Sequence, residues 1–259
     1  MKLKVLSLIL FICLFIGFGF SQPKSEPFAV GEKLTYEGKL SKSVLRGISV
    51  AELTFTVEKD SNEKNYLIKA DAVSKGTLLK LFRFSFIQNI ESVVDKELFR
   101  ASKTVKFDQQ GDRIRKSEAV FDYQEKKVTY IENDPKDAMK APRKIASAIE
   151  TDETHDIITA IYQLRRLPLA VGKKFELSVS DSGLVYKIPV SVTAREHQNS
   201  VSGKVWCFRI EPQVFGDGRF IEQKGSMIIW ISDDAKRLPI RSIINASIGK
   251  LDVKLKKIG

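Results

Sequence analysis

The sequence has little cysteine and little histidine, with two of each among 259 residues. Cys13 lies in an apolar N-terminal run, so once that run is removed Cys207 stands alone and no intramolecular disulfide can form. His155 and His197 are distant from each other, and with one cysteine they form no metal-ligand cluster. We therefore predict no metal, no other cofactor, and a fold that depends on core packing.

Catalytic motifs are also missing. The chain contains no G-x-S-x-G nucleophile elbow, no P-loop and no G-x-G-x-x-G fingerprint. His155 and Asp156 are neighbours, but adjacent helical residues do not face each other, which favours capping by Asp156 and either packing or a partner contact by His155. Asp233 and Asp234 are explained by turn chemistry. We predict no catalytic residue and no enzyme activity, and a hydrolase ranks third among our hypotheses.

The N-terminus has the layout of a secretory signal peptide. Lys2 and Lys4 precede the apolar run Val5–Phe20, and Gly19 and Ser21 offer small residues at a cleavage site. We predict a signal peptide over residues 1–21, with a retained membrane anchor as the alternative. The protein is then exported, and periplasmic or envelope-associated, with no transmembrane segment after cleavage.

The charge balance is basic, with 43 Lys and Arg against 32 Asp and Glu. In an exported protein this favours lipid head groups, other anionic envelope components or acidic proteins as partners, and disfavours nucleic acid. The lysines are scattered along the chain, so a solvated face that confers solubility is the competing interpretation.

Most of the chain alternates between apolar and polar residues, as half-buried antiparallel strands do. The predicted strands are Gly47–Glu58, Tyr66–Ala72, Phe84–Val94, Phe99–Phe107, Arg113–Tyr123, Lys127–Ile131, Lys174–Val179, Val185–Arg195, Lys204–Glu211, Gly225–Ile231, Leu238–Ala246 and Leu251–Lys257. Gly76–Phe82 is predicted as one helical turn or a loop, and Asn133–Arg143 as a mobile polar loop. Turn residues such as Gly216-Asp217-Gly218 separate most strands. The sequence predicts a mainly β protein built on an antiparallel sheet.

One stretch, Thr154–Leu167, predicts a sustained amphipathic helix. Apolar residues at three- and four-residue spacing share one face: Ile157, Ile158, Ile161, Leu164 and Leu167. Pro168 ends the helix. We expect the helix to pack on the sheet as a lid or plug.

Two segments repeat at similar spacing. Ala29–Tyr36 is matched by Ala170–Leu177, with Gly31 and Gly172 at corresponding positions. A second match relates Asp95–Arg100 to Asp233–Arg241, with Leu98 and Leu238 at corresponding positions. We interpret this as a structural duplication. The predicted organisation is a flexible leader over residues 22–27 and a single β-rich domain over 28–259, made of pseudo-repeated halves 28–168 and 169–259.

These motifs resemble a family of bacterial exported proteins. The matching residues are Phe28–Tyr36, His155-Asp156, Tyr162–Arg165, Leu167–Leu169, Val171-Gly172 and Ile229–Arg241. They are similar to the domain-of-unknown-function family numbered thirty-one-oh-eight, and the resemblance implies an exported, envelope-associated β-rich domain with no catalytic residues to carry over. Ile157-Ile158-Thr159 departs from the family pattern. The Trp230-x-x-Asp233-Asp234 turn also resembles the open barrels of bacterial lipoprotein carriers, which implies an open or partial barrel.

Aromatic residues provide the candidate ligand-binding set. In a closed sandwich they would fill the core, whereas in an open barrel they would line a cavity for an acyl chain. The candidates are Phe84, Phe86, Ile158, Ile161, Trp206, Phe208 and Trp230. Our first hypothesis is a non-enzymatic domain that binds a lipid or another amphiphilic envelope component. The alternative is a structural or adaptor module of an envelope assembly, with a filled core and an envelope protein as partner.

Overall fold

The computed structural model describes residues 26–137, 139–213, 227–246 and 249–259, which form one 15-stranded sheet and two helices. The helices are α1 (Gly76–Phe82) and α2 (Ile157–Arg166). The strands are β1 Lys33–Lys42, β2 Leu45–Lys59, β3 Asn65–Ser74, β4 Phe86–Asp95, β5 Ala101–Gln110, β6 Arg113–Asp122, β7 Lys127–Asn133, β8 Arg143–Ala148, β9 Thr154–Asp156, β10 Lys174–Asp181, β11 Leu184–Ser200, β12 Gly203–Pro212, β13 Met227–Ser232, β14 Pro239–Ala246 and β15 Gly249–Ile258.

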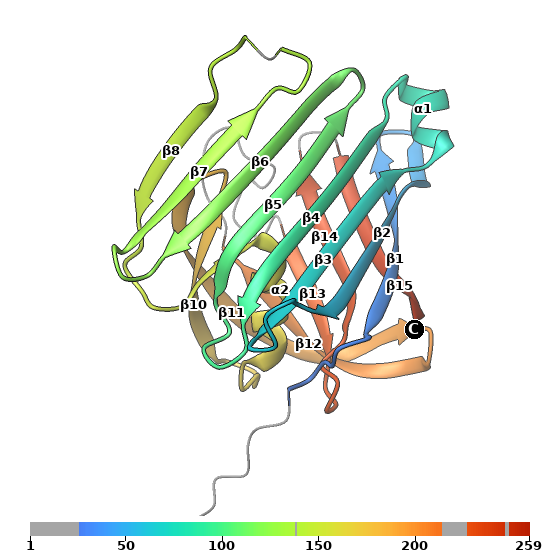
Figure 1. The fold of residues 1–259 in the computed structure, drawn as a ribbon. Coiled ribbons are helices and arrows are strands. Elements are labelled where there is room, and N and C mark those ends of the chain that lie inside the picture. The colour runs from blue at the N-terminus through green and yellow to red at the C-terminus, as the bar shows by residue number, and fades with distance from the viewer. Residues whose placement is uncertain (1–25, 138, 214–226, 247–248) are drawn as a thin grey trace, which may run out of the picture.

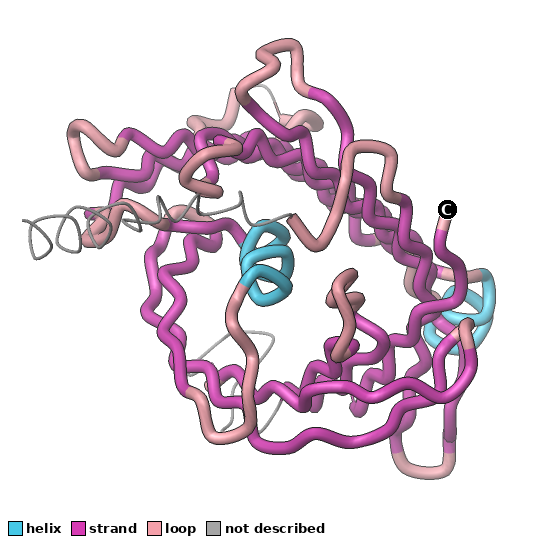
Figure 2. Tube along the Cα trace, turned by 90° about the horizontal axis from the view of Figure 1, so that it is seen from below, coloured by secondary structure: helices cyan, strands magenta, loops and turns pink. Residues whose placement is uncertain are grey.

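The sheet is a continuous meander that curls on itself (Figures 1 and 2). Its order runs from β8 back to β1, then from β15 back to β9, and β1 pairs with β15 in the middle. All neighbours are antiparallel except β9 and β10, which are parallel because α2 connects them. The free edges are β8 and β9, which follow each other in the chain, and the sheet is not closed into a barrel. The predicted mainly β, partial-barrel fold is confirmed.

Some local predictions need correction. Thr154–Asp156 is strand β9 and not the first turn of the helix, because it pairs with Ser178–Ser180 of β10. Residues 143–148, for which the sequence pattern predicts no strand, form β8 and pair with β7. The predicted signal peptide, most of the leader, the Gly216–Gly218 turn and the start of the strand at Gly225 lie outside the described residues.

α2 lies inside the curve of the sheet (Figure 2). Ile158 and Tyr162 join a core cluster formed on β2, β3 and β4, while Ala160 and Leu164 join a second cluster formed on β10 to β13. The predicted single apolar face is wrong at Ile157, whose side chain is 47% exposed. Since sheet surrounds the helix on several sides, its polar residues Thr159, Gln163 and Arg165 are also buried. The helix therefore acts as a plug.

The first sequence match has the same backbone geometry in both copies. Gly31 and Gly172 adopt positive φ angles of 95° and 87°, which glycine tolerates without strain. The Gly31 N–H donates to Val57 O at 2.8 Å, and the Gly172 N–H donates to Val192 O at 2.9 Å. The second match is less regular, because Leu98 is exposed whereas Leu238 is buried. The duplication of whole halves stays a prediction.

Candidate functional site

The inward face of β4 to β7 changes character along its length. Near α2 its positions are apolar and buried, as at Val94, Phe121 and Val128. Farther along the same face of these strands the side chains are polar or charged: Gln88, Lys106, Asp108, Gln110, Arg113, Arg115, Ser117 and Glu132. Inward positions of a packed barrel are normally apolar, so this part of the face has the composition of a hydrated surface.

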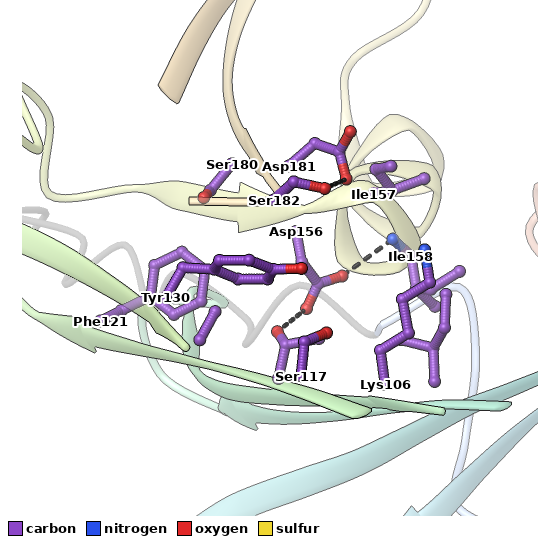
Figure 3. Close-up of a pocket in the computed structure, with 13 residues that line it drawn as sticks. Lys106, Ser117, Phe121, Tyr130, Asp156, Ile157, Ile158, Ser180, Asp181 and Ser182 are labelled. Carbon is purple, nitrogen blue, oxygen red and sulfur yellow. Dashed lines mark hydrogen bonds between the residues drawn. The ribbon is translucent and has the colours of Figure 1, made fainter. Parts of the chain in front are cut away.

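A small pocket lies where the apolar and polar parts of this face meet (Figure 3). Its volume is about 50 Å³, and it separates the start of α2 from β4 to β7. It is lined by Ile90, Thr104, Lys106, Ser117, Ala119, Phe121, Tyr130, Asp156, Ile157, Ile158, Ser180, Asp181 and Ser182. Such a space holds one or two water molecules or the end of a ligand, since small-molecule pockets usually exceed about 300 Å³.

Asp156, at the edge of the pocket, has a structural role, because both of its carboxylate oxygens accept hydrogen bonds within the protein. Its Oδ1 accepts hydrogen bonds from the Ile158 and Thr159 N–H groups, and the Thr159 hydroxyl accepts one from the Asp156 N–H, so the residues form a capping box. Its Oδ2 accepts a hydrogen bond of 2.7 Å from the Thr104 hydroxyl. The predicted capping role is confirmed, and the carboxylate also ties α2 to β5.

His155 is buried on β9, and its Nδ1 has no hydrogen-bond partner within the described chain. Burial, with a smaller contribution from the Arg166 charge, lowers the pKa of His155 to about 4, so the ring is neutral at physiological pH. It packs 6.2 Å from the Phe99 ring, as the predicted packing role requires. His197 is exposed as predicted, but it lies in β11 and not in a turn.

Charges on the polar part of the inward face are mostly paired. Asp108 accepts hydrogen bonds from Gln88, Gln110 and Arg113, which outweigh its burial and hold its pKa below the ordinary value. Arg115 pairs with Asp134 and Glu132.

Lys106 differs from these paired charges. No carboxylate of the described residues lies within ion-pair distance of its ammonium group, although Lys106 lines the pocket. The site therefore offers a cation without an ion pair beside an apolar surface, although its charge also acts on the Asp108 carboxylate and helps to lower the pKa of that group.

The seven predicted ligand-binding residues are dispersed. Ile158 lines the pocket, Ile161 is half-buried on α2, Phe86 packs beside α1, and Phe84 is 39% exposed. Phe208 belongs to the cluster around α2.

The two tryptophans have separate surroundings. Trp230 is buried in another cluster and donates a hydrogen bond to Glu196. Trp206 is 43% exposed and stacks on His197, with ring centroids 3.6 Å apart. The seven residues therefore do not line one cavity, and their contact with a ligand stays a prediction.

Sequence reasoning missed the polar residues of the pocket, above all Thr104, Lys106 and Ser117. A signal was available, because the strands around them carry polar residues on both faces, which an ordinary core strand does not. Cys207, expected to be a small buried hydrophobe, is fully buried, and burial raises the pKa of its thiol to about 12.

Two further features of the described residues bear on function. No helix among them has the length and apolar character needed to cross a membrane. Within the same ranges, no three His, Cys, Asp or Glu side chains gather as metal ligands would.

Comparisons with known proteins show a family and a similar fold. No curated protein matches the sequence. A β-barrel-like protein of domain of unknown function DUF1849 from Brucella abortus is similar in structure, with a TM-score of 0.57 and 11% identity over 88% of this chain and 96% of that one. A Bacteroides fragilis protein with a YmcC-like fold, described as exported, gives a TM-score of 0.33 and 9% identity over 90% of this chain and 97% of the other. The model of the family "Protein of unknown function (DUF3108)" matches residues 34–256, so the chain belongs to the DUF3108 family.

Proposed function

We propose that this protein is an exported, non-enzymatic domain that binds an amphiphilic envelope molecule with an anionic group on the inward face of its sheet. The observation that carries the proposal is the change from apolar to polar side chains along this face, with the Lys106 ammonium at the pocket between the two parts. An amphiphile has the same two parts, and an unpaired cation favours an anionic head group.

The other wall of the curved sheet supplies an apolar surface. Met227, Ile244 and Leu251 are half-buried cross-strand partners on one face of β13, β14 and β15, the face that also carries Ile229 of the cluster around α2. Ile157 adds an exposed apolar side chain at the start of the helix. A chain laid along this wall would bury apolar surface, while its head group would meet the polar wall of β4 to β7.

Binding accounts for the described site better than catalysis does. A general base needs an accessible lone pair within reach of substrate and a pKa near the working pH. His155 is buried with a pKa of about 4 and does not line the pocket, and Asp156 is occupied as a helix cap. Two hydroxyl–carboxylate pairs line the pocket, but in the first, Thr104 with Asp156, the carboxylate is the helix cap. The second, Ser182 with Asp181 at 3.3 Å, is exposed, and no histidine is among the described lining residues.

The first test asks whether the protein carries a ligand. The full chain is expressed with its own leader, extracted from the periplasm without detergent and examined by native mass spectrometry. We expect a bound species that dissociates as a lipid. Ligand-free protein that also fails to take up a fluorescent fatty acid or lysophospholipid would refute the proposal.

The second test locates the ligand. Lys106→Gln removes the unpaired cation and should weaken fluorescent-ligand binding about tenfold, the effect of one charge-assisted contact worth roughly 1.5 kcal/mol. Lys116→Gln is the matched control, because Lys116 lies on the neighbouring strand with its side chain on the outer face. Ala119→Met should fill the pocket and reduce binding further. Equal binding by all three variants would place the ligand elsewhere.

An adaptor role is the second candidate, and strand β8 is the observation that favours it. β8 pairs in the sheet only with β7. The start of β11 packs near β8, but no strand among the described residues pairs with its other edge, which can add an extended segment of a partner. Arg143 and Lys144 on this strand favour an acidic segment.

The adaptor role has its own test. The Ala146 N–H points away from β7 in the antiparallel pattern, so Ala146→Pro should block strand addition without breaking the β7 pairing. The adaptor role predicts a discrete in-cell crosslink from β8 to a partner, and Ala146→Pro should abolish this crosslink. Such a result would favour the adaptor role if the purified protein also carries no lipid.

A further inference from the structure

The β1–β2 turn and α1 lie at the same end of the sheet (Figure 1). Three large apolar side chains on and beside them are exposed. Val44, at the tip of the turn, is 91% exposed. Leu81 on α1 is 52% exposed, and Phe84, which follows the helix, is 39% exposed. The core does not need these side chains, since large apolar groups that stabilise a fold are normally buried. Their exposure at loop and helix tips marks a contact surface.

The same two segments are basic and contain no acidic residue. The ranges 38–51 and 72–90 include no Asp or Glu, and they carry Lys42, Arg46, Lys75, Lys80 and Arg83 near the exposed apolar groups. Lys75 forms an ion pair of 3.6 Å with Glu37. The other four are exposed, and no carboxylate among the described residues lies within 4.0 Å of their charges. Ordinary surfaces mix both signs of charge, so a one-sign region indicates an anionic partner.

The structure holds this region firmly in place. Leu78 of α1 is buried in a cluster with Leu40, Val50 and Ala51 of β1 and β2. The Lys75 N–H donates to Val50 O at 2.7 Å. The Thr77 hydroxyl donates to the Ser49 carbonyl oxygen. α1 therefore presents Leu81 outward from a fixed base, and changing an outward residue need not disturb the fold.

We propose that the β1–β2 turn and α1, called here the docking rim (residues 42–46 and 75–84), bind the surface of a membrane rich in anionic lipid. Exposed apolar side chains enter the boundary between head groups and acyl chains, while nearby lysine and arginine groups bind lipid phosphates. Both requirements are met within the rim. A protein partner of ordinary mixed charge would leave the four unpaired cations without counterions.

The docking rim is joined to the polar part of the inward face. The Gly111 N–H of the β5–β6 turn donates to Ser85 O at 2.8 Å, directly after the rim. Gln88, on the inward face of β4, follows shortly after Ser85 in the chain. Docking would thus bring that end of the sheet to the lipid head groups. The inference does not rest on the proposed ligand site, because a rim of this composition binds a membrane whether or not the sheet holds a ligand.

The test is co-sedimentation of purified protein with vesicles of phosphatidylethanolamine and phosphatidylglycerol, compared with vesicles of phosphatidylcholine alone. We expect binding only to the anionic vesicles, weakened by salt. Lys80→Gln/Arg83→Gln should lower the partition coefficient about 30-fold, since each cation near an anionic surface contributes about one kcal/mol. Val44→Gln/Leu81→Gln should lower it without changing net charge.

The matched control is Lys64→Gln/Lys126→Gln, which removes two exposed cations from the turns at the other end of the sheet. The control should bind as wild type does, and all variants should keep the wild-type unfolding midpoint. Wild-type protein that ignores anionic vesicles, or a control that loses binding equally, would overturn the proposal. A dimer in sedimentation velocity that Val44→Gln/Leu81→Gln dissociates would instead assign the rim to self-association.

Discussion

Two consecutive arginines of α2 make ion pairs of very different burial, and this difference allows a matched test. Arg165, with a side chain 1% exposed, donates to Glu32 Oε1 at 2.6 Å and to Oε2 at 2.8 Å. It also donates to Pro27 O at 2.8 Å and to Lys236 O at 3.0 Å. Arg166 pairs with Glu26 at 2.8 Å, but both of these side chains are about one quarter exposed.

Glu32→Gln keeps the size of the side chain and removes its charge. The Arg165 guanidinium then stays buried without a counterion, which costs about 3–5 kcal/mol of unfolding free energy. Glu26→Gln makes the same chemical change where water can solvate the remaining charge, so its cost should stay below about 1 kcal/mol.

Urea unfolding, followed by tryptophan fluorescence, measures both variants under one set of conditions. We expect Glu32→Gln to lower the midpoint strongly and Glu26→Gln to shift it little. Glu32→Leu/Arg165→Met should be more stable than Glu32→Gln, because removing both charges eliminates the unpaired ion. Losses of similar size for Glu32→Gln and Glu26→Gln would show that burial does not set the strength of these pairs.

Two further predictions concern the contact between the β10–β11 turn and β7, and the buried histidine. A Cβ at Gly183, which has a φ of +84°, would lie 2.5 Å from the Tyr130 Cβ, whereas a Cβ at Gly203, with a φ of +93°, meets nothing within 4 Å. Gly183→Ala should therefore cost about 3 kcal/mol in thermal or urea unfolding, against about 1–2 kcal/mol for Gly203→Ala, and equal costs would contradict the contact. His155 has a pKa near 6.5 when unfolded and about 4 when folded, so the unfolded chain binds more protons as pH falls, and stability is lost from about pH 6.5 down to pH 4. The loss should approach 3 kcal/mol and be smaller in His155→Phe; parallel pH profiles for the two proteins would exclude this histidine as the cause.

Strand alternation was predictive because it depends on local geometry. Leu53, Phe55 and Val57 point to one face whatever the rest of the chain does, and they lie in β2 as expected. The glycines at 31 and 172 were recognisable for the same reason, since their turns need a positive φ angle. α1 coincides with the stretch predicted as one helical turn or a loop, and the helical alternative is the correct one.

Features set by distant contacts were not predictable. β9 has three residues and exists because β10 lies beside it, so no periodicity in Thr154–Asp156 could reveal it. Burial of Arg165 depends on Glu32, which is far away in the chain. The dispersed aromatic set has the same origin. Strand parity says that Trp206 and Phe208 share a face, but Trp206 stacks on the exposed His197, whereas Phe208 packs into the cluster around α2. Only the folded sheet brings Lys106 to the start of α2.

The pairing of β1 with β15 has a consequence for how the chain folds. Lys33 and Gly259 exchange backbone hydrogen bonds, so the two ends of the described domain meet at the centre of the sheet, while its open edges belong to strands that follow each other in sequence. During synthesis one edge of β1 can pair with β2 early, but its other edge stays unpaired until β15 has been made. A circular permutant that joins residue 259 to residue 26 and opens the chain between β8 and β9 would remove this longest-range pairing. Such a permutant should fold faster than the natural order, with the same native sheet.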